Sequence, residues 1–216
     1  MKRIYLDHAA TTPLDPEVIA HMSALMAEVT GNPSSIHAEG RRARTVIEEA
    51  RARVARLLNA SIGEIFFTSG GTESSNMVLK TAHRDRGIRR FISSPTEHHC
   101  VLHTLQRLGR EPDTEVLWLQ TDAHGSPDLS QLETLLAHSP TPTLVSLMHA
   151  NNETGALLDL ERAGRICRAH GALFHSDTVQ TMGYFPFDLE ALPIDMMTGS
   201  GHKFYGPKGC GFVYIR

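Results

Sequence analysis

The chain has 216 residues, 41% of them hydrophobic, which suits a substantial buried core. Its 21 basic and 24 acidic residues give a formal net charge of -3 without a long run of either sign, which argues against nucleic acid or a lipid surface as the main partner. No apolar stretch approaches the roughly 20 residues of a membrane helix, and the first residues lack the apolar core of a signal peptide, so we expect a cytoplasmic protein whose partner is a small molecule or a protein.

Residues 1–14 are expected to form an N-terminal arm and residues 15–216 one large domain. The domain begins with helical patterns at 15–29 and 38–58. From residue 64 on, short β-rich runs alternate with further helices. The expected strands are 64–68, 90–94, 115–120, 143–149, 172–177, 195–199 and 211–215. The expected helices between them are 72–86, 97–108, 128–137 and 158–170, with Asp128 and Asp159 as N-caps of the last two.

Most of these strands are almost continuously apolar, which is typical of strands that are covered on both faces. The alternation predicts a three-layer α/β fold, with a mostly parallel sheet and helices on both of its faces. Ligands of such sheets bind beyond the carboxyl ends of the strands, so the segments that follow the predicted strands are the candidate site. Cys100, Cys167 and Cys210 are far apart and odd in number, and neither disulfides nor a metal site is expected.

The segment 68–74, after the first strand, contains the pair Gly70 and Gly71. Paired glycines let the backbone approach an anion, the amides of a helix N-terminus point at it, and Thr72 adds a hydroxyl donor. This pattern predicts a phosphate site. The alternative is a glycine-rich start of a helix that Ser69 or Thr72 caps.

Asp177 ends the strand 172–177, and Gln180 follows three residues later. A carboxylate at the buried end of a strand is costly unless a cation pairs with it, and a protonated pyridine nitrogen is such a cation. Gln180 could then reach another substituent of the same ring. The alternative is an aspartate that caps the following turn.

The run Ser200-Gly201-His202-Lys203 follows the strand 195–199. A lysine beside a buried cofactor loses its proton more easily and can attack an aldehyde, while Ser200 and His202 can donate to a phosphate. The alternative is an ordinary solvated lysine.

Histidines follow two other strands, as His98 in 96–99 and as His149 in 149–155. Either could stack on an aromatic cofactor or move protons near neutral pH, or could simply be a surface or capping residue in a chain with 13 histidines. Glu97 could be a first-turn acid that favours the helix dipole. Taken together, a phosphate site, a pyridinium partner, a Schiff-base lysine and a stacking base are what pyridoxal 5'-phosphate (PLP) requires.

The sequence resembles the cysteine desulfurases of the NifS/IscS group, a class V branch of the fold-type I PLP enzymes. The matching runs recur in order along the chain, at 5–13, 31–37, 67–74, 96–98, 149–155, 175–180 and 200–209. The resemblance implies a site in which each residue has a role. Lys203 would hold PLP, and His98 would stack on its ring and assist proton transfer. Asp177 would contact the ring nitrogen, Gln180 the phenolic oxygen, and Asn152 would lie against cofactor or substrate. The residues that would bind the phosphate are Gly71, Thr72, Ser200 and His202.

The resemblance also implies conversion of L-cysteine to L-alanine, with the sulfur passed to an enzyme cysteine as a persulfide for iron-sulfur cluster assembly or thio-modification. Members are homodimers and deliver sulfur to a scaffold or acceptor protein. They are nearly twice this length, and their persulfide cysteine and small C-terminal domain lie beyond the point where this chain stops. None of the three cysteines here matches that cysteine, and all three are expected to be structural.

Two alternatives remain open on the sequence. One is a selenocysteine lyase or another class V PLP lyase of the same fold. The other is a non-catalytic PLP-binding or dimerisation module.

Overall fold

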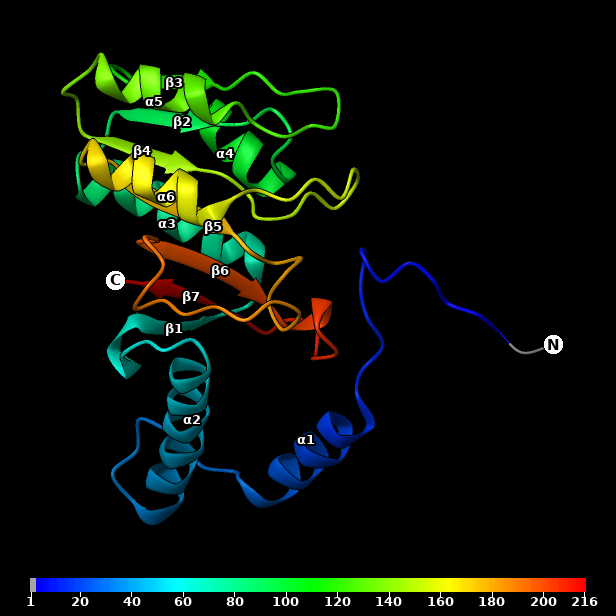
Figure 1. Cartoon of the computed structure of the whole chain (residues 1–216). Coiled ribbons are helices and arrows are strands. Elements are labelled where there is room, and N and C mark those ends of the chain that lie inside the picture. The colour runs from blue at the N-terminus through cyan, green and yellow to red at the C-terminus, as the bar shows by residue number, and fades with distance from the viewer. Residues whose placement is uncertain (1–2) are drawn as a thin grey trace.

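The computed structural model describes residues 3–216 (Figure 1), so that Met1 and Lys2 of the predicted arm lie outside the described residues. Its helices are α1 (Pro16–Glu28), α2 (Ala38–Leu57), α3 (Gly71–Asp85), α4 (His99–Leu108), α5 (Leu129–Ala137) and α6 (Leu160–Ala169), with short 3-10 turns η1 (Ile62–Glu64) and η2 (Gly201–Lys203). Its strands are β1 (Ile65–Thr68), β2 (Arg90–Ser93), β3 (Glu115–Trp118), β4 (Thr143–Ser146), β5 (Leu173–Asp177), β6 (Met196–Ser200) and β7 (Gly211–Ile215).

The seven strands form one sheet in the order β1-β7-β6-β5-β4-β2-β3. The pairs from β6 to β3 are all parallel, while β7 runs antiparallel to both β6 and β1. Strands β1, β2, β4, β5 and β6 therefore all end at the same edge of the sheet. The mostly parallel sheet predicted from the sequence is confirmed.

Helices cover both faces of this sheet (Figure 1), and each face has its own apolar core. Residues of α5 and α6, such as Leu132 and Ile166, pack on one face, and residues of α3 and α4, such as Leu79 and Leu105, pack on the other. The strands between the two cores are buried on both sides, which explains their continuous apolar sequence.

Helix α2 lies beside β1, at the end of the sheet away from β3, and α1 lies farther from the sheet (Figure 1). No residue of α1 is buried, whereas α2 buries Ala43 and Ala55. No helix between residues 3 and 216 is both long and apolar enough to span a bilayer.

The predicted N-caps of α5 and α6 are confirmed, because Asp128 accepts from the amide of Ser130 and Asp159 from that of Arg162. The helix predicted to start at residue 97 instead begins at His99. His98 caps it with its ring, and Glu97 turns into the protein. Both residues thus lie at the carboxyl edge of the sheet rather than on the surface of a helix.

Candidate functional site

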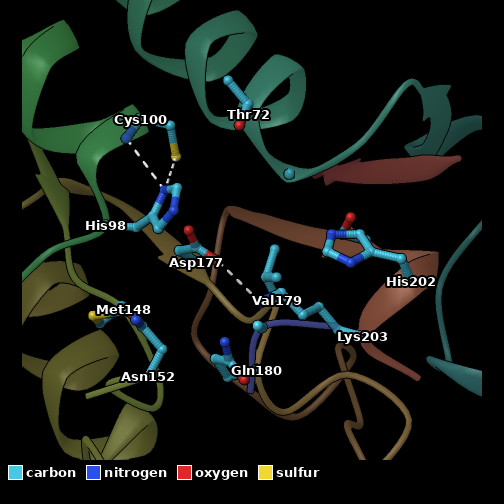
Figure 2. Close-up of a pocket in the computed structure, with 13 residues that line it drawn as sticks. Thr72, His98, Cys100, Met148, Asn152, Asp177, Val179, Gln180, His202 and Lys203 are labelled. Atoms are coloured by element: carbon cyan, nitrogen blue, oxygen red, sulfur yellow. Dashed lines mark hydrogen bonds between the residues drawn. The ribbon is translucent and has the colours of Figure 1, made fainter. Parts of the chain in front are cut away.

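A cavity of about 280 Å³ opens at the carboxyl edge of the sheet (Figure 2). Every residue that the sequence assigned to the site lines it. These nine residues are Gly71, Thr72, His98, Asn152, Asp177, Gln180, Ser200, His202 and Lys203. They come from the segments after β1, β2, β4, β5 and β6, so the fold brings together residues that lie up to 132 positions apart, from 71 to 203. Ala10, Cys100, Met148 and Val179 also line the cavity and were not predicted.

Helix α3 begins at the cavity with a turn that requires glycine. Gly70 is its N-cap with a φ of 151°, a conformation that favours glycine, and no side chain caps the helix. The alternative of a helix capped by Ser69 or Thr72 is therefore wrong. A Cβ on Gly71 would lie 2.6 Å from Cγ2 of Val179, so a larger residue would displace the cavity wall. The uncapped amides and the helix dipole leave an anion site at the position predicted for phosphate.

Asp177 is the last residue of β5 and is only 5% exposed. Its Oδ1 accepts from the amide of Val179 at 3.0 Å, so it also makes the turn contact that the alternative interpretation expected. Burial raises the pKa of Asp177, and the bond from Val179 opposes this effect. Among residues 3–216, no basic side chain forms an ion pair with it within 4.0 Å. A buried carboxylate in this position favours a cationic ligand.

Lys203 ends η2 and is partly buried at the cavity, not freely solvated. Burial lowers the pKa of its ammonium group, while the charges of Asp177 and Asp7 oppose that shift. Its Nζ donates to the carbonyl oxygen of Ala9. A lysine that gives up its proton more easily than usual suits attack on an aldehyde.

The N-terminal segment lies against the cavity. The carbonyl oxygen of Ala9 also accepts from Nε2 of Gln180 at 3.0 Å. The hydroxyls of Thr11 and Thr12 donate to the carbonyl oxygen of His202 at 3.3 and 3.0 Å, and Nδ1 of His202 lies 3.1 Å from Oγ1 of Thr11. The segment is thus attached by hydrogen bonds to the loop that carries Lys203. The run 5–13 is one of the motifs that carry the resemblance. The contacts made by the backbone carbonyl of Ala9 could not be predicted, because they do not depend on its side chain.

The two candidate histidines occupy different places. His98 lines the cavity at the start of α4. His149 is buried away from it, with Nδ1 2.9 Å from Oγ1 of Thr181 and its ring edge-on to Phe185 and Phe187. Burial lowers the pKa of His149 to about 4, which favours the neutral ring of a core residue. Of the two histidines, only His98 is placed to meet a ligand.

Glu97 is not the exposed first-turn acid that the sequence allowed. It is 4% exposed, and its Oε1 accepts from the amide of Met148 at 2.6 Å. Burial raises its pKa well above the usual range. Asn151 ties the same two loops together, because its Nδ2 donates to the carbonyl oxygen of Thr96 at 2.8 Å. Asn152, the next residue, faces the cavity.

All three cysteines are free, and their surroundings differ. Cys167 is buried in α6, as expected of a structural residue. Cys100 lines the cavity and Cys210 is exposed, so the expectation that all three are structural is wrong for these two. Within residues 3–216, no three or more His, Cys, Asp and Glu side chains come together as a metal site.

The chain is similar to known proteins along its whole length. The model of the family named Aminotransferase class-V matches residues 4–216. Cysteine desulfurase IscS of Dictyoglomus turgidum is 45% identical over 223 residues, which cover 100% of this chain and 55% of that protein. Putative cysteine desulfurase IscS 1 of Bacillus subtilis is 42% identical, covering 99% of this chain and 56% of its own length. These relatives confirm the predicted resemblance.

Solved structures agree with the sequence matches. A NifS-like protein superposes with a TM-score of 0.93 at 42% identity, over 100% of this chain and 59% of its own. SspA in complex with cysteine superposes with a TM-score of 0.93 at 35% identity, over 99% of this chain and 61% of its own. The chain therefore spans about half the length of the curated relatives that it matches, and somewhat more of the two structures.

Proposed function

Because the chain belongs to the class-V aminotransferase family, whose cofactor is PLP, we propose that the cavity beside Lys203 binds PLP for a cysteine desulfurase reaction. The observation that carries this proposal is Asp177, a buried carboxylate with no ion-pair partner among the described residues. It lines the same cavity as a lysine whose pKa is lowered. A cofactor with a cationic ring nitrogen and an aldehyde satisfies both side chains.

The lining residues divide by chemistry. Lys203 would hold the cofactor covalently through Nζ, and Asp177 would keep a proton on the ring nitrogen. Gln180 would contact the phenolic oxygen. The start of α3 would hold the phosphate, together with the polar side chains that face it. We assign Gly71, Thr72, Ser200 and His202 to the phosphate, and His98 and Asn152 to the ring and the bound amino acid.

PLP, when bound, supplies an electron sink that eases loss of the α-proton of an amino acid. The chain's own residues prepare this chemistry. The carboxylate of Asp177 would stabilise a positive charge on the cofactor ring. Lys203, with its lowered pKa, would hold the cofactor through Nζ and could accept or return a proton at that atom. The His98 ring, at the start of α4, covers one side of the cavity.

We propose L-cysteine as the substrate and L-alanine as the product, with the sulfur carried on as a persulfide to an acceptor for iron-sulfur assembly or thio-modification. The names of the relatives support cysteine over selenocysteine. The persulfide would form on a cysteine other than the three in this chain. Burial raises the pKa of both Cys100 and Cys167 to about 12, which leaves almost no thiolate at neutral pH. Cys210 is exposed and does not line the cavity.

The chain would act as the PLP-binding large domain, residues 15–216, with residues 1–14 as an arm across the site. We further propose a cytoplasmic homodimer that hands sulfur to a scaffold or other acceptor protein.

Borohydride trapping tests the cofactor. The purified chain, incubated with PLP, should develop a visible absorbance band that borohydride removes, and peptide mapping should then find the label on Lys203. Lys203→Ala should abolish the band and the label. Lys80→Ala, at an exposed lysine of α3 that is remote from the cavity lining, should leave both unchanged. Labelling of another lysine, or no label at all, would refute the assignment.

L-cysteine and a thiol reductant test the reaction. Alanine and sulfide should not form over many turnovers with residues 1–216 alone, because the proposed persulfide cysteine is elsewhere. Repeated turnover by this chain alone would show that one of its own cysteines carries the sulfur.

A further inference from the structure

Cys100 contacts the side chain that would stack on the cofactor (Figure 2). Its Sγ lies 3.0 Å from Nδ1 of His98, and its backbone amide donates to the same nitrogen at 3.2 Å. Both contacts come from the first turn of α4, of which His98 is the N-cap. A single ring nitrogen is thus held from two sides by one residue.

The backbone contact fixes the direction of the thiol contact. A backbone N–H can only donate, so Nδ1 of His98 must present its lone pair and carry no proton. The thiol must then donate its S–H to the same lone pair. Burial, reinforced by the charge of Asp177, raises the pKa of Cys100 to about 12 and keeps the sulfur protonated for this role. The buried hydroxyl of Ser75 also lies beside the thiol and opposes the rise in its pKa, while the 3.0 Å contact with Nδ1 of His98 gives the S–H its acceptor.

We propose that Cys100 is a positioning residue, whose thiol holds the ring of His98 in the Nε2–H tautomer at the wall of the cavity. A neutral histidine carries one ring proton, so a blocked Nδ1 places that proton on Nε2. The ring then presents a donor, not a base, on the side away from Cys100. Nδ1 stays blocked as long as the backbone amide and the thiol of Cys100 both donate to it.

Three titratable groups lie near His98. Asp177, at the end of β5, also lines the cavity and interacts with His98 electrostatically. Glu97 precedes it in the chain and has its pKa raised by burial. The ring of His99 lies 6.1 Å away, centroid to centroid, on α4.

The tautomer can be measured in the apo chain, which separates this proposal from the assignment of PLP on which its functional meaning rests. Long-range ¹H–¹⁵N spectra of histidine-labelled protein report which ring nitrogen carries the proton, and His98→Asn assigns the resonances. We expect an unprotonated Nδ1 in the parent. Cys100→Ala should increase the Nδ1–H share about threefold, as for loss of one weak hydrogen bond, and Cys100→Ser should restore the parent spectrum. Cys210→Ala, at an exposed cysteine outside the cavity lining, is the matched control and should change nothing.

A second variant covers the case in which Cys100→Ala does not fold. Cys100→Val fills a similar volume without an S–H and should produce the same shift in tautomer. A protonated Nδ1 in the parent, or an unchanged ratio once the S–H has been removed, would overturn the proposal. A tautomer shift without any borohydride-trapped Lys203 would support the role of Cys100 and refute the PLP assignment instead.

Discussion

Replacing Asp177 by asparagine removes a buried charge but keeps an oxygen that can accept from the amide of Val179. Its effect on the apo chain follows from the direction of the pKa shift. Because burial raises the folded-state pKa of Asp177, its contribution to stability is present below the unfolded-state pKa of 3.8 and is lost as the pH rises through the folded-state pKa. At pH 7, Asp177→Asn should therefore stabilise the apo chain. The desolvation cost of a buried polar group predicts a gain of about 1–3 kcal/mol.

The same substitution should have the opposite effect on cofactor binding. Removing one partner of a buried charge pair costs about 3–5 kcal/mol, which corresponds to a loss of roughly 150- to 4,000-fold in affinity for PLP. Urea denaturation of the apo chain and absorbance titration with PLP measure the two effects. Asp122→Asn, at an exposed acid remote from the cavity, is the control for affinity. An apo chain that is destabilised at pH 7, or an affinity for PLP equal to that of the parent, would refute the reasoning.

Three further predictions concern one residue that lines the cavity and two that are buried behind it. Gly71→Ala places a Cβ 2.6 Å from Cγ2 of Val179, so it should cost about 1–3 kcal/mol of stability in urea and weaken PLP binding; unchanged binding would contradict the close packing. Glu97→Gln should leave stability at pH 7 unchanged or higher, because burial favours the neutral acid. Glu97→Ala should lose about 1–3 kcal/mol of stability, because it leaves the amide of Met148 unpaired. Equal losses in the two variants would refute a neutral Glu97. Burial lowers the pKa of His149 from 6.5 to about 4. Its contribution to stability, present above pH 6.5, should therefore fall by up to about 3 kcal/mol as the pH drops to 4. Urea denaturation across this pH range should show a smaller pH dependence in His149→Gln than in the parent, and an equal dependence would contradict this.

The sheet could be predicted because its strands are short apolar runs between helices with clear periodicity. Phe91 and Phe174, for example, lie in strands that are buried on both faces, and the sequence around them shows this directly. The boundaries near the site were harder. Glu97 and His98 belong to a helix by pattern. Glu97 instead turns into the core, because a tertiary contact with Met148 competes with helix propensity, and the ring of His98 caps the helix through a local bond from the amide of Cys100.

The site could be predicted by position more than by residue type. Gly71, Asp177 and Lys203 each had an ordinary alternative explanation, and only the rule that parallel strands end at one edge placed them together. Groups that act through the backbone could not be predicted in this way. The carbonyl oxygen of Ala9 accepts from Lys203 and Gln180, and no property of an alanine side chain indicates this.

His98 shows how the function depends on contacts that position alone does not reveal. The strand-end rule identified it together with His149, and the structure then separated them, one at the cavity and one in the core. The tautomer that we propose for it depends on a contact two residues along the chain, where the sequence predicts that Cys100 is a structural residue. The first turn of α4 directs both the amide and the thiol of Cys100 at Nδ1 of His98. A cysteine that the sequence predicts to be structural can thus determine which nitrogen of the His98 ring carries the proton.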